Sequence, residues 1–118
     1  MKKRDPRVNV TFILECIELI EEYLKDITED EFMDTTKLQD AIIRRIELIG
    51  EAVKDISKSI KENYPQIPWK RIAGMRDILI HDYLGIDLDT TWQVAQNEIL
   101  VLKQEMLKIK RDLEEKNA

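Results

Sequence analysis

Three segments of the chain repeat apolar residues at the three- and four-residue spacing of an α-helix, and this repetition limits the possible folds more than any other feature. The repeats are Ile13, Ile17, Ile20, Leu24 and Ile27, then Leu38, Ile42, Ile46, Ile49, Val53, Ile56 and Ile60, then Trp92, Ala95, Ile99, Leu102, Met106, Ile109 and Leu113. No segment has convincing strand alternation. We therefore predict an all-α fold, an antiparallel helical bundle of three long helices plus one or two short helices.

Polar residues indicate where these helices begin. Asp5, followed by a proline, is typical of an N-cap and a first-turn proline. Thr36 with Gln39 predicts a capping box at the start of the second helix. This helix should continue through its whole apolar repeat, with Asn63 and Pro65 marking its end. Asp87 or Asp89 is expected to cap the third helix.

Gly50 lies in the middle of the second predicted helix, where glycine costs about 1 kcal/mol relative to alanine. Its presence there predicts the close approach of another backbone. Trp92 begins the third apolar repeat, and we expect it in the core.

Residues 64–85 are the most irregular part of the chain and hold two of its three prolines, two of its three glycines and its only histidine. Pro68 is expected to start a short helical turn that ends at Ala73. A further helix is predicted from about Gly74 to Tyr83, with Gly85 as a left-handed C-cap.

The length of 118 residues fits a single domain, residues 1–118. With 43% hydrophobic and 36% charged residues, the composition suits amphipathic helices in water, and no apolar run approaches the roughly 18 residues that span a bilayer. The single cysteine, Cys16, and the lack of a recognisable secretory signal favour a reducing, cytoplasmic location without membrane contact. One cysteine and one histidine cannot form a zinc site within one chain, so no metal or cofactor is expected.

The net charge of −5 argues against nucleic-acid binding, but the charges are unevenly distributed. Residues 44–76 hold eight basic and four acidic residues, so this segment carries +4 and the remainder −9. The segment is either the solvated face of a helix or a basic surface that meets phosphates. In the second case Lys70 and Arg71 are candidate substrate-binding residues.

Residues 76–83 contain the side chains best suited to chemistry. Arg76 is a permanent cation, and His81 is the only side chain whose ordinary pKa lies near neutrality. On a helix, Asp77 would lie one turn before His81 and could orient its ring, and Tyr83 would share a face with Arg76. Equally, a single histidine beside an aspartate is often an ordinary surface residue.

Five residues turn a helix about 140° beyond one revolution, so Arg76 and His81 are not neighbours on a straight helix. They could converge if the helix loosens near Gly85, or they could flank a groove that a second copy completes. We favour the groove, because it would also cover a leftover apolar face.

The sequence resembles the HepT-like toxins of the HEPN superfamily of helical ribonucleases. Their motif R-x-x-x-x-H-x-Y is matched by Arg76, His81 and Tyr83. The similarity extends over residues 32–52, which include the segment I-G-E-A, then over I-P-W at residues 67–69, G-M-R-D at 74–77 and on to Trp92. It is weak before residue 30 and after residue 100.

This resemblance implies a metal-independent endoribonuclease that acts as a homodimer and is the toxin of a toxin–antitoxin pair. It also implies a nucleotidyltransferase antitoxin that transfers AMP to the motif tyrosine, here Tyr83, and so blocks cleavage. We expect Arg76 to bind the scissile phosphate of the RNA substrate, His81 to act as general acid or base, and Asp77 to orient His81.

Two alternatives remain open. One is a non-catalytic member of the same fold, a nucleotide-binding or scaffold subunit of a nucleotidyltransferase complex. The other is a helix-bundle adaptor that buries a partner helix. Growth arrest on expression that is lost in His81→Ala would favour the nuclease over both.

Overall fold

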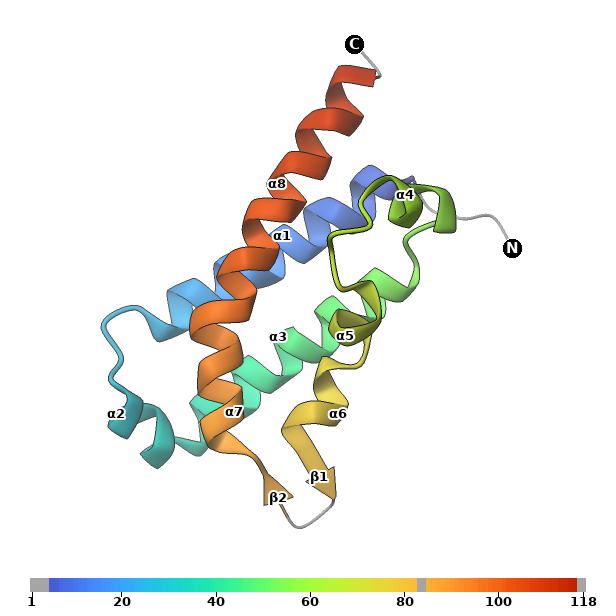
Figure 1. The fold of residues 1–118 in the computed structure, drawn as a ribbon. Coiled ribbons are helices and arrows are strands. Elements are labelled where there is room, and N and C mark those ends of the chain that lie inside the picture. Colours follow the sequence, from blue (N-terminus) through green and yellow to red (C-terminus); the bar gives the residue numbers. More distant parts are fainter. Residues whose placement is uncertain (1–4, 83–84, 117–118) are drawn as a thin grey trace.

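Three long helices form the frame of the fold, as Figure 1 shows. The computed structural model describes residues 5–82 and 85–116, and of residues 81 and 82 only the backbone. The long helices are α1 (Pro6–Leu24), α3 (Thr36–Lys54) and α8 (Ile99–Lys116). Their apolar repeats are buried, so the prediction of an all-α bundle with three long helices is confirmed.

Short elements connect the long helices, and the described part of the chain has more of them than the one or two predicted. They are α2 (Glu29–Asp34), α4 (Lys58–Asn63), α5 (Trp69–Ala73), α6 (Met75–Leu79), β1 (Ile80–Asp82), β2 (Gly85–Ile86) and α7 (Leu88–Gln93). A π-helical turn, Val94–Glu98, leads from α7 directly into α8. Within the described residues, no helix is both long and apolar enough to cross a membrane.

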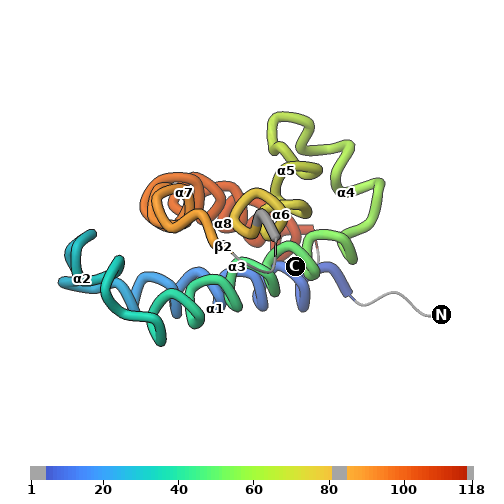
Figure 2. Tube along the Cα trace, turned by 90° about the horizontal axis from the view of Figure 1, so that it is seen from below, coloured from blue at the N-terminus to red at the C-terminus, as the bar shows by residue number. Residues whose placement is uncertain are grey.

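The helices lie in two layers, which Figure 2 shows from below. Helices α1 and α3 lie side by side in one layer, and α7–α8 and α5–α6 lie on the other side of the core. Helix α1 packs against both α3 and α8, whereas α3 also packs against α5 and α6. Trp92 is half-buried at the edge of the core, with its ring centroid 5.4 Å from that of Phe32.

Two predicted helix starts are confirmed. The Asp5 carboxylate accepts a hydrogen bond from the backbone N–H of Arg7 at 2.9 Å, and proline occupies the first turn of α1. The Asp87 carboxylate accepts from the backbone N–H of Thr90 at 3.0 Å and caps α7. Both caps satisfy backbone donors that a helix leaves without partners.

The predicted capping box of Thr36 and Gln39 is wrong. The N-cap of α3 is Thr35, which makes no side-chain cap, and Gln39 points back toward α2 and donates its amide to the carbonyl of Phe32 at 2.9 Å. The capping box of this region lies at the start of α2, where Thr28 and Glu31 bond reciprocally. The second apolar repeat is also interrupted, since α3 ends at Lys54 and α4 is a separate helix.

The predicted helix from Gly74 to Tyr83 is wrong in its second half. Helix α6 ends at Leu79, and Ile80 adopts an extended conformation that begins a two-stranded antiparallel ribbon with β2. The Leu79 carbonyl accepts a hydrogen bond from the backbone N–H of Asp87 at 2.7 Å, which replaces the helical continuation. The left-handed C-cap at Gly85 is wrong as well, because no described glycine has a positive φ.

Candidate active site

Gly50 brings α5 and α6 against α3. A Cβ atom at this position would lie 3.0 Å from the carbonyl oxygen of Ala73 and 3.3 Å from that of Ile72. The predicted close approach of another backbone is therefore confirmed. Since α6 begins directly after α5, this contact fixes where Arg76 stands relative to α3.

A polar hollow of about 300 Å³ lies at this contact, between α3 and the α5–α6 segment. It is lined by Glu47, Gly50, Glu51, Lys54, Ala73, Arg76 and Asp77. The Arg76 side chain is 49% exposed, so its guanidinium is open to a ligand that enters the hollow.

One carboxylate holds Arg76. The Arg76 Nε donates to Glu47 Oε2 at 2.8 Å, and the other oxygen of Glu47 accepts from Arg44 Nη1 at 2.6 Å. The hydrogen bond from Arg44 is the main cause that lowers the pKa of Glu47 below its ordinary value. Burial opposes it, and the hydrogen bond from Arg76 adds to the lowering. Glu47 is therefore anionic near neutral pH and fully occupied by two guanidinium groups.

Asp77 lies in the first turn of α6 with its side chain 84% exposed. Its nearest cationic atom in the described part of the chain is Arg76 Nη1, at 3.8 Å, which is too long for a hydrogen bond. The helical argument that placed Asp77 against His81 no longer holds, because α6 ends two residues before His81.

The backbone of His81 lies in β1, directly after α6, and its side chain lies outside the described part. Tyr83 lies outside the described residues entirely. The strand changes the geometry expected from a helix: successive residues of a strand alternate between two faces, so the helical angle between Arg76 and His81 does not apply.

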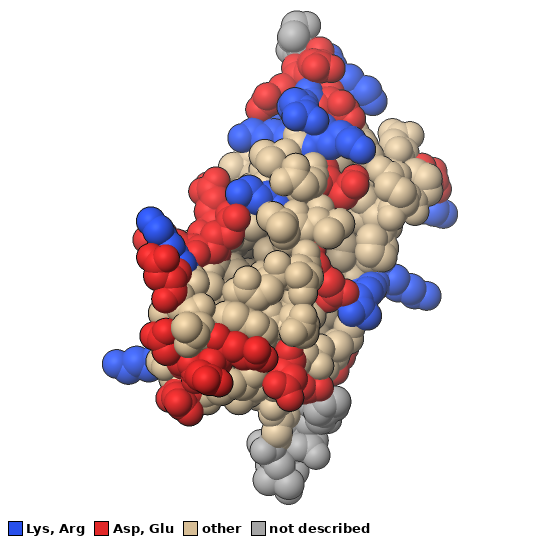
Figure 3. All heavy atoms as spheres, turned by 60° about the vertical axis from the view of Figure 1, so that its left-hand side comes forward, with Lys and Arg blue, Asp and Glu red and all other residues tan. Residues whose placement is uncertain are grey.

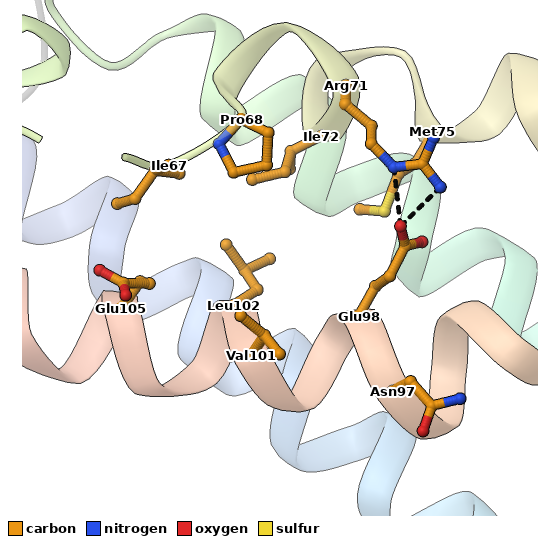
Figure 4. A pocket seen from close by; sticks show the side chains of 10 residues that line it. All are labelled: Ile67, Pro68, Arg71, Ile72, Met75, Asn97, Glu98, Val101, Leu102 and Glu105. Carbon is orange, nitrogen blue, oxygen red and sulfur yellow. Dashed lines mark hydrogen bonds and ion pairs between the residues drawn. The ribbon is translucent and has the colours of Figure 1, made fainter. Parts of the chain in front are cut away.

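Lys70 and Arg71, the other predicted substrate-binding residues, lie on α5, but Arg71 turns away from the hollow. Figure 4 shows Arg71 bound to Glu98 at one end of a second, largely apolar cavity of about 290 Å³ between α5–α6 and α8. Arg71 Nε donates to Glu98 Oε1 at 2.7 Å, while Glu98 Oε2 is buried and has no hydrogen-bond partner among the described residues. Lys70 is exposed on the same helix. The structure thus separates Arg71 from Arg76.

Acidic side chains cover another part of the molecule. Figure 3 shows them gathered over the lower part of the face that includes α2, whose first turn consists of Glu29, Asp30 and Glu31. An anionic ligand is repelled there. A phosphate is therefore not expected to approach over α2.

Glu47, the partner that α3 supplies to Arg76, was not predicted from the sequence. Glu47, Glu51 and Lys54 lie three or four residues from Gly50 or from each other, and these spacings place them on one face of a helix. Because a mid-helix glycine marks where another backbone approaches, the polar residues beside Gly50 could have been assigned to that contact. Within the described residues, no group of three or more His, Cys, Asp or Glu side chains is placed to hold a metal ion.

Comparison with known proteins adds independent information. A family model described as "Ribonuclease HepT-like" matches residues 13–109. The chain is 53% identical over 112 residues to the "Gamma-glutamylcyclotransferase and putative RNase MJ0434" of Methanocaldococcus jannaschii, where the match covers 95% of this chain and 50% of that protein. It is also 47% identical over 116 residues to the "Putative RNase MJ0125" of the same organism, covering 98% of this chain and 100% of that one.

A third relative is the "Probable ribonuclease HepT" of Thermococcus cleftensis, which is 40% identical over 109 residues, with 92% of this chain and 99% of that protein covered. The chain thus spans about half of the M. jannaschii protein of highest identity among these three and nearly all of the other two. Among solved structures, none matches significantly.

Proposed function

The chain belongs to the HepT-like ribonuclease family, and from this premise we propose that it is a metal-independent endoribonuclease that uses Arg76 and His81. The observation that supports the proposal best is the state of Arg76. Its guanidinium lies half-exposed in a polar hollow, and in the described part of the chain only its Nε donates a hydrogen bond. Two terminal nitrogens are thereby available for a forked contact with a phosphate.

RNA supplies its own nucleophile, so the protein needs only to move protons and stabilise charge. The 2′-oxygen attacks the adjacent phosphorus, the bond to the 5′-oxygen breaks, and a 2′,3′-cyclic phosphate forms. His81 takes the proton from the 2′-hydroxyl or gives one to the leaving oxygen. Arg76 stabilises the extra negative charge on the phosphate oxygens. Asp77 stays a candidate for orienting His81, but the helical spacing that suggested this role does not apply, because α6 ends before His81.

We further propose that the chain acts as a homodimer whose two motifs face one groove. Val8 and Phe12 on α1 and Leu100 and Val101 on α8 are large apolar side chains exposed on the single chain. Covering such side chains with a second copy would remove apolar area from water, which favours association.

The proposed regulation acts at Tyr83. A nucleotidyltransferase antitoxin would transfer AMP from ATP to the tyrosine: the phenol oxygen attacks the α-phosphorus, pyrophosphate leaves, and the phenol proton is released. The added phosphate is anionic and bulky. It would compete with RNA for Arg76 if the two groups share the groove, and so silence the toxin.

Expression in a bacterial host tests this proposal. The wild-type chain should arrest growth with fragmentation of cellular RNA, and His81→Ala should relieve both. Co-expression with the nucleotidyltransferase should restore growth and add the mass of one AMP to the wild type but not to Tyr83→Phe. A Tyr83→Phe protein that gained AMP to the same extent would refute the modification site. Tight binding of the nucleotidyltransferase without toxicity or RNA cleavage would indicate a scaffold instead.

A further inference from the structure

Glu47 is brought to Arg76 by the packing of α3 against the α5–α6 segment, and not by a chance meeting of two surface side chains. It lies on α3 three residues before Gly50, on the face where α5 and α6 approach, and its side chain is only 29% exposed. The ion pair with Arg76 joins residues 29 positions apart in the sequence. The backbone contact at Gly50 fixes α5, and with it the adjoining α6, against α3. The Glu47 carboxylate and the Arg76 guanidinium therefore meet without the movement of a loop.

The contact uses one particular edge of the guanidinium. Glu47 Oε2 accepts from Nε, the nitrogen nearest the chain, at 2.8 Å. Arg44 occupies the other oxygen of Glu47, so the carboxylate is itself held from a second side. An exposed arginine otherwise samples many rotamers, and a fixed Nε restricts the plane and direction of the whole group.

We propose that Glu47 is a positioning residue for RNA cleavage, which holds the Nε edge of Arg76 so that the two terminal nitrogens form a forked contact with the scissile phosphate. This inference rests on the proposed ribonuclease function. Glu47 touches neither substrate nor reacting atoms and acts only through Arg76. The opposite role, a carboxylate that competes with phosphate for Arg76, predicts the opposite kinetic effect.

Two substitutions separate these roles. Glu47→Ala removes the acceptor and lets the guanidinium rotate, and a misplacement of about 1 Å can cost up to about 100-fold in rate. We expect about a tenfold loss in kcat with KM changed less than about threefold. Glu47→Gln keeps one oxygen that can accept from Nε at the same chain length and loses only the acceptor of Arg44. Its kcat should therefore stay within about threefold of wild type.

Glu21 supplies the matched control. Its carboxylate joins α1 to α8 through Lys103 at 2.9 Å and is 43% exposed, but it lies away from the hollow. Glu21→Ala therefore removes a similar inter-helix ion pair and should leave kcat unchanged. Equal losses in Glu47→Ala and Glu21→Ala would overturn the inference, as would a faster Glu47→Ala or a Glu47→Gln as slow as the alanine variant.

A second readout does not depend on cleavage. The Nε–H signal of Arg76 in an NMR spectrum can be assigned as the one missing in Arg76→Ala. In the wild type it should exchange with water more slowly than that of the exposed Arg111, and Glu47→Ala but not Glu21→Ala should abolish this protection. If the wild type cut no RNA, the proposed ribonuclease function would be wrong. If the Arg76 Nε–H of the wild type exchanged as fast as that of Arg111, the proposed hydrogen bond from Arg76 to Glu47 would be wrong.

Discussion

Replacing His81 with alanine is expected to lower the rate of RNA cleavage by about 10²–10⁴-fold, the usual contribution of a positioned acid or base. The imidazole is the only histidine side chain of this sequence, so no second group of similar pKa can take over the proton transfer. The helical signal in circular dichroism should stay at the wild-type level, because the three long helices carry the core.

Replacing Arg76 with alanine should cost about 10²–10³-fold, the range found when one stabilising donor is removed from a transition state. If Arg76 and His81 act in the same step, the cleavage rate of the double variant should be only slightly lower than that of the more impaired single variant. Single-turnover cleavage of a labelled RNA measures all three rates. Arg111→Ala, the same change at an exposed site on α8, is the matched control and should cleave at the wild-type rate.

Replacing Gly50 with valine is expected to disrupt the site and the fold together. Its Cβ would press on the carbonyl oxygens of Ala73 and Ile72 at 3.0 and 3.3 Å, and backbone atoms at the end of α5 cannot turn aside as a side chain can. Overpacking of this kind typically lowers the free energy of unfolding by about 1–3 kcal/mol. Displacement of α5 and α6 would also carry Arg76 away from Glu47, with a loss of cleavage of up to about 100-fold.

Urea unfolding and single-turnover cleavage measure both effects. Gly74→Ala is the control, since its Cβ would meet the carbonyl oxygens of Lys70 and Arg71 at 3.5 and 4.0 Å, both ordinary contact distances. Gly50→Ala should lower the free energy of unfolding less than Gly50→Val and more than Gly74→Ala, because the gain of about 1 kcal/mol in helix propensity offsets part of the clash. A Gly50→Val protein as stable and active as the wild type would show that the α3–α5 contact does not position the site.

The sequence predicted those features that depend on residues close together along the chain. The apolar repeats placed the long helices, Asp5 and Asp87 capped α1 and α7 as expected, and Gly50 marked the backbone contact. Each of these follows from periodicity or from one local hydrogen bond.

Features that depend on tertiary contacts were missed. The helix predicted for residues 74–83 ends at Leu79, because the carbonyl of Leu79 accepts a hydrogen bond from the N–H of Asp87 across the ribbon. The contact of Arg76 with Glu47 joins two segments that only the folded core brings together. Arg71 was predicted as a substrate-binding residue, but Glu98, in the π-helical turn, binds it in a different cavity.

Cleavage of a labelled RNA by the purified wild-type chain in excess EDTA is the decisive test of metal-independent cleavage by Arg76 and His81. We expect fragments that end in a 2′,3′-cyclic phosphate, and no cut at a nucleotide whose 2′-hydroxyl is replaced by hydrogen. Arg76→Ala and His81→Ala proteins should cleave the same RNA at least about 100-fold more slowly. Cleavage that required a divalent cation, or that persisted at the wild-type rate in the Arg76→Ala protein, would refute the proposed mechanism.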